Sequence, residues 1–357
     1  MELLSVTMND GVMPRSEIEG KDNSSEDKSN YKVVLTGDMV YNSMRMWQGA
    51  NGISPCDGIV SPAYTVLMPK IPISNGYFAA FFKSPNLINE FRKNSQGMTS
   101  DTWNLKYPQI ETIKVCIPAL SEQNRVADML RTLERRIAKQ AQLVDNLKKY
   151  KRGVVRTLLS PDSCCIEETT WTTAKIGDLG SFTKGAPLSK ADITPDGTPF
   201  ILYGELYTTY HEVINSVIRR TKAQPEKQYY SHVGDVIIPT SGETPEEIST
   251  AACVMLPDTI LAGDLNIFRS SKIDGRIMSY ILNHIVNGQI ARIAQGKSVV
   301  HIQASEISKI EISYPDYNTQ CKMISVFETV GARIKSAENE LTYLRTMQKA
   351  LLQQLFI

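Results

Sequence analysis

The chain has 357 residues, which is enough for two or three domains at roughly 100 to 200 residues each. With 42% hydrophobic and 22% charged residues, its composition is that of a globular protein and excludes disordered, collagen-like and low-complexity classes. The net charge of +1 does not by itself indicate a polyanionic partner.

No apolar run approaches the roughly 18 to 20 residues of a membrane span, and residues 1–10 lack the pattern of an export signal. We therefore expect a cytoplasmic protein with no membrane partner. The six cysteines show no C-x-x-C spacing, and the four histidines show no metal-ligand spacing, so neither a disulfide framework nor a metal site is predicted.

Residues 1–117 form the first predicted domain, an α/β head. A turn at Gly37 and Asp38 leads into a strand at 39–41, and residues 77–94 have the apolar spacing of one helix with a buried aromatic side. The aromatic side chains there are interpreted as core and not as a ligand site.

Residues 118–160 form the second predicted segment, a long helix whose apolar positions recur in steps of four and three. Ser121 and Glu122 are the expected N-terminal caps. The segment carries 10 Lys and Arg against 4 Asp and Glu, so the excess positive charge lies here.

Residues 161–315 form a second predicted α/β head, and residues 316–357 a second long helix, capped by Asn318 and Thr319. In the head we expect an opening strand and turn from Trp171, strands at 199–203 and 236–239, and one helix at 276–294. Like the first head, this head has no excess of positive charge, with 13 Lys and Arg against 18 Asp and Glu.

The second head and helix repeat the first at a constant offset of 197, as Ile113, Pro118 and Gln123 recur as Ile310, Pro315 and Gln320. Two heptad seams in one chain should pair, so we predict an antiparallel coiled coil. Its expected spacer positions are Leu130, Leu133, Ile137 and Leu147 in the first helix, and Phe327, Val330, Ile334 and Leu344 in the second. A helical hairpin used only as core stays open as the alternative.

This arrangement resembles the DNA specificity subunit of type I restriction-modification systems. The motifs that carry the resemblance are Ile-Pro-x-Leu-Ser-Glu-Gln-Asn-Arg-Val-Ala at 117–127, a weaker copy at 314–324, and the segments 37–49 and 58–64. The resemblance implies a tandem repeat of two α/β target-recognition domains that read a split sequence in double-stranded DNA. It also implies that the paired helices set the gap and dock two methyltransferase subunits, through which restriction and translocase subunits join.

By the same resemblance the chain is expected to be a non-catalytic subunit without cofactors, with S-adenosylmethionine, ATP and Mg held by partner subunits. The sequence offers no methyl-donor loop of its own. Residues 291–298 satisfy a relaxed P-loop pattern, but they follow a predicted helix where a phosphate-binding loop follows a strand. A nucleotide hydrolase is thus the competing enzyme hypothesis.

Base reading requires hydrogen-bonding side chains on loops, and each head has two such loops. Arg45 could bind guanine, Gln48 or Asn42 adenine, and Glu243 cytosine. The full set of candidate DNA-binding residues is Asn42, Ser43, Arg45, Trp47, Gln48, Thr99 and Asn104 in the first head, and Thr240, Ser241, Glu243, Lys297, Ser298 and His301 in the second. A coiled-coil adaptor or orphan subunit that competes for partners without reading DNA is the non-enzyme alternative.

The first head departs from the repeat at its start. At the offset of 197, Trp171 has no counterpart, so about 27 residues that open the second head are missing from the first. Either the start lies upstream or this head is incomplete, and we expect an unpaired strand edge where the element would lie.

Overall fold

The structure is a computed structural model that describes all residues except 9, 21–23, 295–299 and 357. It divides into two compact units, each described by itself below. Unit 1 contains Met1–Val144 and Ser336–Ile357, and unit 2 contains Asp145–Lys335. Helix α4 (Leu120–Leu158) and helix α11 (Tyr317–Leu355) each contribute one part to either unit.

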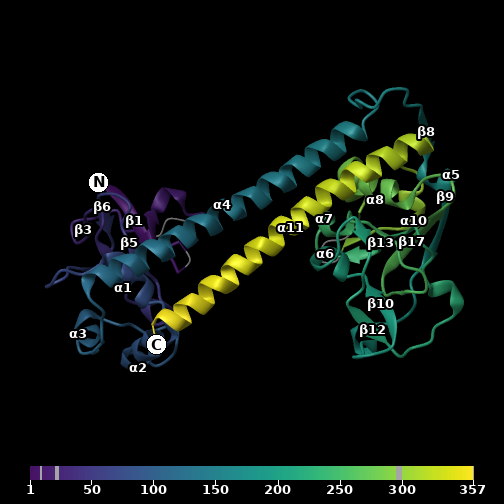
Figure 1. The fold of residues 1–357 in the computed structure, drawn as a ribbon. Coiled ribbons are helices and arrows are strands. Elements are labelled where there is room, and N and C mark those ends of the chain that lie inside the picture. Colours follow the sequence, from purple (N-terminus) through teal and green to yellow (C-terminus); the bar gives the residue numbers. More distant parts are fainter. Residues whose placement is uncertain (9, 21–23, 295–299, 357) are drawn as a thin grey trace. The chain divides into compact units, whose positions relative to one another are not determined.

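Unit 2 is built on a five-stranded sheet of strand order β11-β15-β13-β17-β9 (Figure 1). Its strands are β11 (Val213–Ile214), β15 (Ala252–Val254), β13 (Asp235–Pro239), β17 (Leu265–Ser270) and β9 (Gly180–Lys184). Every residue of β13 is buried, as expected of a central strand.

Smaller sheets and helices complete unit 2. A three-stranded sheet has the order β12-β10-β16, with β10 (Thr198–Leu202), β12 (Arg219–Thr221) and β16 (Ile260–Ala262), while β14 (Ser241–Gly242) pairs with β18 (Val300–His301) and β19 (Glu311–Pro315) with β8 (Trp171–Lys175). The short helices are α5 (Ile176–Leu179), α6 (Glu205–Thr208), α7 (Pro245–Ile248), α8 (Gly275–His284), α9 (Asn287–Ile293), α10 (Ala304–Ile307), η3 (Lys190–Asp192) and η4 (Lys227–Tyr229).

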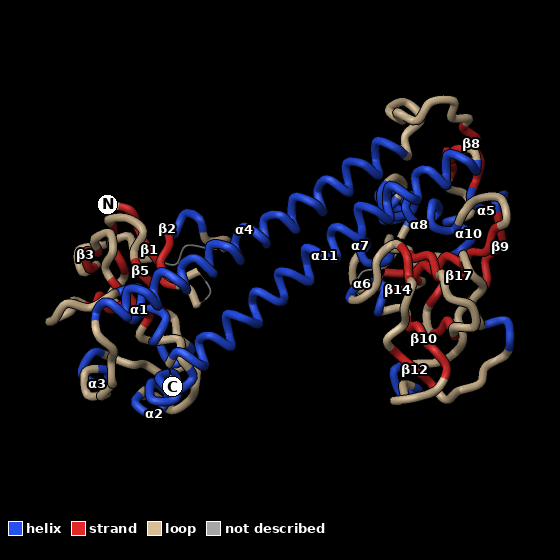
Figure 2. Tube along the Cα trace, viewed as in Figure 1, coloured by secondary structure: helices blue, strands red, loops and turns tan. Residues whose placement is uncertain are grey.

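Unit 1 contains two small sheets (Figure 2). The sheet of order β2-β1-β6-β3 is made of β1 (Glu2–Val6), β2 (Val12–Pro14), β3 (Lys32–Val34) and β6 (Gly58–Val60), and the sheet of order β5-β4-β7 of β4 (Met39–Asn42), β5 (Asn51–Ile53) and β7 (Tyr64–Leu67). The helices are α1 (Asn75–Phe81), α2 (Pro85–Asn94), α3 (Tyr107–Ile110), η1 (Arg15–Glu17) and η2 (Met46–Gln48).

The predicted helix pairing is confirmed within each unit. In unit 1, Gln140 donates to the backbone oxygen of Ala337 at 3.0 Å, and Arg136 forms an ion pair with Glu340 at 3.0 Å. Because residue numbers rise along α4 as they fall along α11, the helices run antiparallel. In unit 2, the end of α4 and the start of α11 share one hydrophobic cluster, which contains Val155, Leu158, Leu159, Met323, Ile324 and Phe327.

The expected seam positions lie at this interface. Leu130, Leu133 and Leu344 are buried in unit 1, as are Phe327, Val330 and Ile334 in unit 2, and Ile137 and Leu147 are half-buried. Burial of a Leu-type side chain contributes about 1.5 to 3 kcal/mol, so these positions stabilise the pairing.

Equivalent hydrogen bonds confirm the internal repeat. The Gln123 side chain accepts from the backbone of Ser74 at 3.0 Å, and Gln320 accepts from Asp274 at 2.9 Å in the same way. Each glutamine also donates to the proline five residues before it, at 2.9 and 2.8 Å. In both copies, the start of the long helix is therefore tied to the N-terminus of α1 or α8.

Two expected helices are each broken into two. The segment 77–94 is interrupted at Ser84, which caps α2 ahead of Pro85, because a proline is favoured in the first turn of a helix and disfavoured inside one. The segment 276–294 is interrupted between His284 and Asn287. Apolar periodicity continued across both breaks and therefore hid them.

The capping prediction for the second long helix was also wrong. Asp316 is the cap of α11, since its carboxylate accepts from the Thr319 backbone at 3.1 Å and from the Thr319 hydroxyl at 2.9 Å. These hydrogen bonds lower the pKa of the Asp316 carboxyl.

Candidate nucleic-acid interface

In unit 1, a backbone hydrogen bond joins the two loops that carry the candidate residues. The Leu105 N–H donates to the Ser43 oxygen at 2.8 Å. Gln96 and Asn104 exchange backbone bonds of 3.0 and 2.8 Å, which closes the loop between them. The loop after β4 and the loop that contains Thr99 therefore lie side by side.

Arg45 and Gln48 are presented by a short helical turn. The Arg45 oxygen accepts from Gln48 at 2.9 Å and from Ala50 at 3.2 Å, which fixes the backbone of η2. Gly49 ends the turn at φ +84°, a conformation that glycine adopts readily. Arg45 is exposed and Gln48 half-exposed, so both side chains are accessible to a ligand.

Trp47 is a packing residue of this loop as well as a candidate contact. Its indole N–H donates to the Met44 oxygen at 3.1 Å, and its ring meets Trp103 edge to face at 5.1 Å. The Arg92 guanidinium lies 5.6 Å from the Trp47 ring centroid, a cation–π distance. The sequence did not single out Arg92, because it comes from α2 and only the fold brings it to the loop.

The remaining candidates of unit 1 already have structural partners or little exposure. Ser43 is 7% exposed and lies 3.3 Å from the Thr65 hydroxyl. Asn42 accepts from the Met44 backbone at 3.0 Å, and Thr99 shares a turn with Thr102. The Asn104 side-chain oxygen is buried and finds no partner among the described residues.

In unit 2, the same arrangement recurs with an equivalent hydrogen bond. The Ile302 N–H donates to the Thr240 oxygen at 3.0 Å, at positions offset by 197 from Leu105 and Ser43. Strand pairing places Ser241 opposite His301. Thr240, Ser241 and His301 are thereby brought together, whereas Lys297 and Ser298 lie outside the described residues.

Glu243 projects from this loop. Its carboxylate is exposed, while its backbone N–H donates to the Glu247 carboxylate at 2.9 Å. Ser241 is 6% exposed and is held by Asp264, which accepts from its hydroxyl at 2.8 Å, and by the Tyr207 hydroxyl, which donates to its oxygen at 2.6 Å. Of these side chains, Glu243 and His301 are the exposed ones.

A cleft of about 1130 Å³ opens beside this loop in unit 2. Its walls come from the segment around η3, the end of β10 with α6, and the β14 loop. Its charged lining residues are Lys190, Arg219, Glu205, Glu243, Glu247 and Asp264. Glu205 and Arg219 pair at 3.0 Å, which leaves the cleft acidic on balance.

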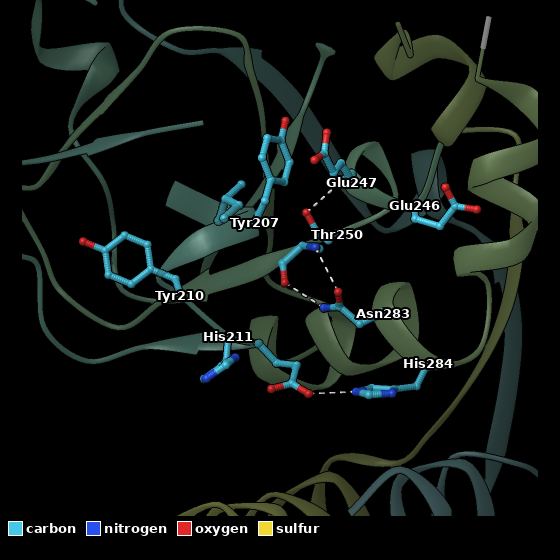
Figure 3. Close-up of a pocket in the computed structure, with 11 residues that line it drawn as sticks. Tyr207, Tyr210, His211, Glu246, Glu247, Thr250, Asn283 and His284 are labelled. Carbon is cyan, nitrogen blue, oxygen red and sulfur yellow. Dashed lines mark hydrogen bonds and ion pairs between the residues drawn. The ribbon is translucent and has the colours of Figure 1, made fainter. Parts of the chain in front are cut away.

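A smaller pocket of about 420 Å³ lies behind α6 and α7 and shares Tyr207 and Glu247 with the cleft (Figure 3). Glu212, at its floor, accepts from His284 at 2.8 Å and from Lys151 of α4 at 2.7 Å. Burial raises the pKa of the Glu212 carboxyl, but these two partners outweigh it and lower the pKa to about 2. This charge cluster holds the second head on α4.

The structure offers no support for a nucleotide or metal site. Among the described residues, no cluster of three or more His, Cys, Asp or Glu could hold a metal ion. The P-loop-like pattern is preceded by α9 and followed by β18, the reverse of the order that phosphate binding requires, although its loop lies outside the described residues. None of the described helices is long and apolar enough to cross a membrane.

The fold thus defines a class of protein with two repeated α/β heads, each followed by a long helix that pairs with the other. Two solved structures share it. One is the type I restriction-modification S subunit from M. genitalium, with 14% identity, a TM-score of 0.60, and coverage of 91% of this chain and 84% of that one. The other comes from work on the assembly and conformational transition of a type I R-M system, with 15% identity, a TM-score of 0.61, and coverage of 98% and 89%.

Residues 168–345 match the model of the type I restriction modification DNA specificity domain. The chain therefore belongs to the family of type I restriction-modification specificity subunits. No curated protein sequence matches the chain significantly.

Proposed function

We propose that the chain reads a split DNA sequence with its two heads and docks methyltransferase subunits on its paired helices. The observation that carries the proposal is the repeated pair of loops, joined by equivalent hydrogen bonds in the two heads. A loop held at the same backbone position in both copies, but with different side chains, suits two readers of different bases.

The exposed side chains supply the chemistry for base reading. Arg45 can donate two hydrogen bonds to guanine O6 and N7, and Gln48 can pair with adenine. Glu243 can accept from the N4 amino group of cytosine, which also explains why an acidic side chain projects beside the cleft.

Partner subunits supply most of the phosphate contacts in this proposal. Heads without excess positive charge gain little non-specific affinity, since that affinity comes from neutralised phosphates. We propose two methyltransferase subunits as these partners, joined by restriction subunits. The chain itself is non-catalytic, with S-adenosylmethionine, ATP and Mg bound by the partners.

Methylation mapping of a reconstituted complex tests this function. Arg45→Ala should relax one base position in one half-site, and Glu243→Ala should do so only in the other, with a loss of about 1 to 3 kcal/mol of discrimination each. Lys70→Ala, an exposed cation outside the loops, is the matched control and should change neither. Equal loss over both half-sites would contradict separate readers.

The second candidate is an adaptor that competes for partner subunits without reading DNA, and the acidic cleft favours it. The same experiment separates the two. An adaptor predicts that Arg45→Ala and Glu243→Ala leave the methylated sequence unchanged.

A further inference from the structure

Unit 1 has an open strand edge at a place where unit 2 has a paired one. In unit 2, β17 pairs with β9, and β19 pairs with β8. The equivalents in unit 1 are β7 and residues 114–117. Strand β7 pairs only with β4 among the described residues, and residues 114–117 form no strand. We call β7 together with residues 114–117 the open edge.

The equivalence of these segments rests on register. Met39 of β4 corresponds to Val236 of β13 at the offset of 197, and they pair with Leu67 and Phe268 respectively. Leu67 therefore occupies the place of Phe268. Because Ile113 and Pro118 recur as Ile310 and Pro315, residues 114–117 occupy the place of 311–314.

Apolar side chains are exposed at the open edge and covered at its equivalent. Val115 is 39% exposed and Ile117 37%, whereas Ile312, the counterpart of Val115, is 3% exposed. All four residues of β7 are half-buried, whereas the first four of β17 are buried. The open edge thus retains the apolar pattern of a covered strand.

Backbone groups are also left without partners. In unit 2, Ile176 donates to Ile310 at 3.0 Å and Asp316 donates to Thr170 at 2.8 Å, at either end of the β8–β19 ladder. Hydrogen-bonded pairs alternate in an antiparallel ladder, so the backbone of Ile312 bonds to β8 and that of Ser313 does not. Residues 114–117 make no backbone hydrogen bond within the described part of the chain.

The covering segment of unit 2 shows what an occupant must bring. Ile176 and Leu179 are 1% and 4% exposed and belong to the main core of that unit, and Phe182 packs on Phe268 at 5.0 Å. Between them, Gly180 lies so close to Arg269 that an added Cβ would come within 2.3 Å of its oxygen. The occupant is therefore a strand, a glycine-containing turn with two apolar anchors, and a second strand.

We propose that the open edge binds a strand–turn–strand segment of this chemistry from a separate polypeptide chain. The undescribed stretches of unit 1, residues 9 and 21–23, are too short to supply two strands. Binding by strand addition gives affinity through backbone hydrogen bonds and specificity through alternate side chains.

A synthetic peptide of residues 168–186 is the probe, because it contains the segment that covers the equivalent edge. The full chain should bind the labelled peptide saturably in fluorescence anisotropy. Hydrogen exchange should slow at residues 64–67 and 114–117 and stay unchanged in β17 and β19. A peptide with Ile176→Asp and Leu179→Asp, which removes both anchors, should bind at least about tenfold more weakly.

Two chain variants identify the binding site. Val115→Pro removes an N–H that the added strand requires, and binding should weaken about tenfold or more. Cys116→Pro is the matched control, since the equivalent Ser313 makes no ladder bond to β8, and it should bind nearly as tightly as the original chain. Both positions are exposed and lack described backbone partners, and circular dichroism confirms that each variant is folded.

Three outcomes would overturn the proposal. The first is the absence of saturable binding at millimolar peptide. The second is equal binding by the Val115→Pro variant, which would place the peptide elsewhere. The third is self-association of the chain without peptide, seen by sedimentation and abolished by Val115→Pro, which would make a second copy the occupant.

Discussion

Glu212 shows how one buried charge connects a recognition head to a helix. Its carboxylate lies between Lys151 of α4 and His284 of α8, and its backbone oxygen accepts from the Ser279 hydroxyl at 2.7 Å. A buried ion pair adds little net stability compared with an apolar substitute, but removal of one partner leaves the other charge unpaired. The position of the head on α4 therefore depends on this residue.

We predict that Glu212→Gln lowers the free energy of unfolding by about 3 kcal/mol at neutral pH. The pKa of Glu212 is depressed from 4.5 to about 2, so its contribution is fully present above pH 4.5 and is lost as the pH falls toward 2. Urea titrations at several pH values should show the difference between the variants shrinking in that window. Glu306→Gln, at an exposed ion pair, is the control and should change stability by less than about 1 kcal/mol at any pH.

At the scale of elements, a single glutamine fixes the start of each long helix. Gln320 is 2% exposed and makes two hydrogen bonds, one from Asp274 and one to Pro315. Gln123 makes the equivalent pair in unit 1. Loss of either side chain leaves two backbone groups without partners.

We predict that Gln320→Leu destabilises unit 2 by about 2 to 4 kcal/mol and speeds hydrogen exchange in α8, while exchange in α1 stays unchanged. Gln123→Leu should do the converse. Exchange measured on the two variants in parallel provides the mutual control. Faster exchange in both helices for either variant would show that the starts of α4 and α11 are not held independently.

How far the sequence predicts the elements depends on the range of the contacts involved. The long helices follow from local heptad periodicity, and the repeat follows from a fixed offset, so both could be predicted. The breaks at Ser84 and after His284 could not be found by periodicity, because the apolar pattern continues across them. The interface was predicted at its loops, whereas Arg92 and the cleft depend on contacts between segments distant in sequence.

At the scale of the whole molecule, the proposed function makes the paired helices a ruler. Four residues inserted after Leu147 advance α4 by about 6 Å and rotate it by about 40°, a stutter that coiled coils absorb by local unwinding. With one base pair rising about 3.4 Å, we predict an unread gap about two base pairs longer and unchanged half-sites. Methylation mapping of the variant is the measurement. An unchanged gap would show that the helices do not set the spacing.

We also predict that the purified chain binds DNA weakly and gains tight, sequence-dependent binding only with methyltransferase subunits. The reason is the small positive charge of the whole chain and the acidic second head. Binding titrations at physiological salt, with and without the partners, measure this. Nanomolar specific binding by the chain alone would contradict it.

Unit 1 is discontinuous in sequence, and this affects the order in which the protein can fold during synthesis. Phe356 lies 5.3 Å from Tyr77 and 5.2 Å from Phe81 in the core of unit 1, and it is 4% exposed. The ribosome makes these aromatic partners long before Phe356, whereas unit 2 is one continuous stretch, Asp145–Lys335. Although domains generally fold in the order of synthesis, here the second head can finish folding first. The nascent first head must keep its aromatic face uncovered until the last turn of α11 emerges.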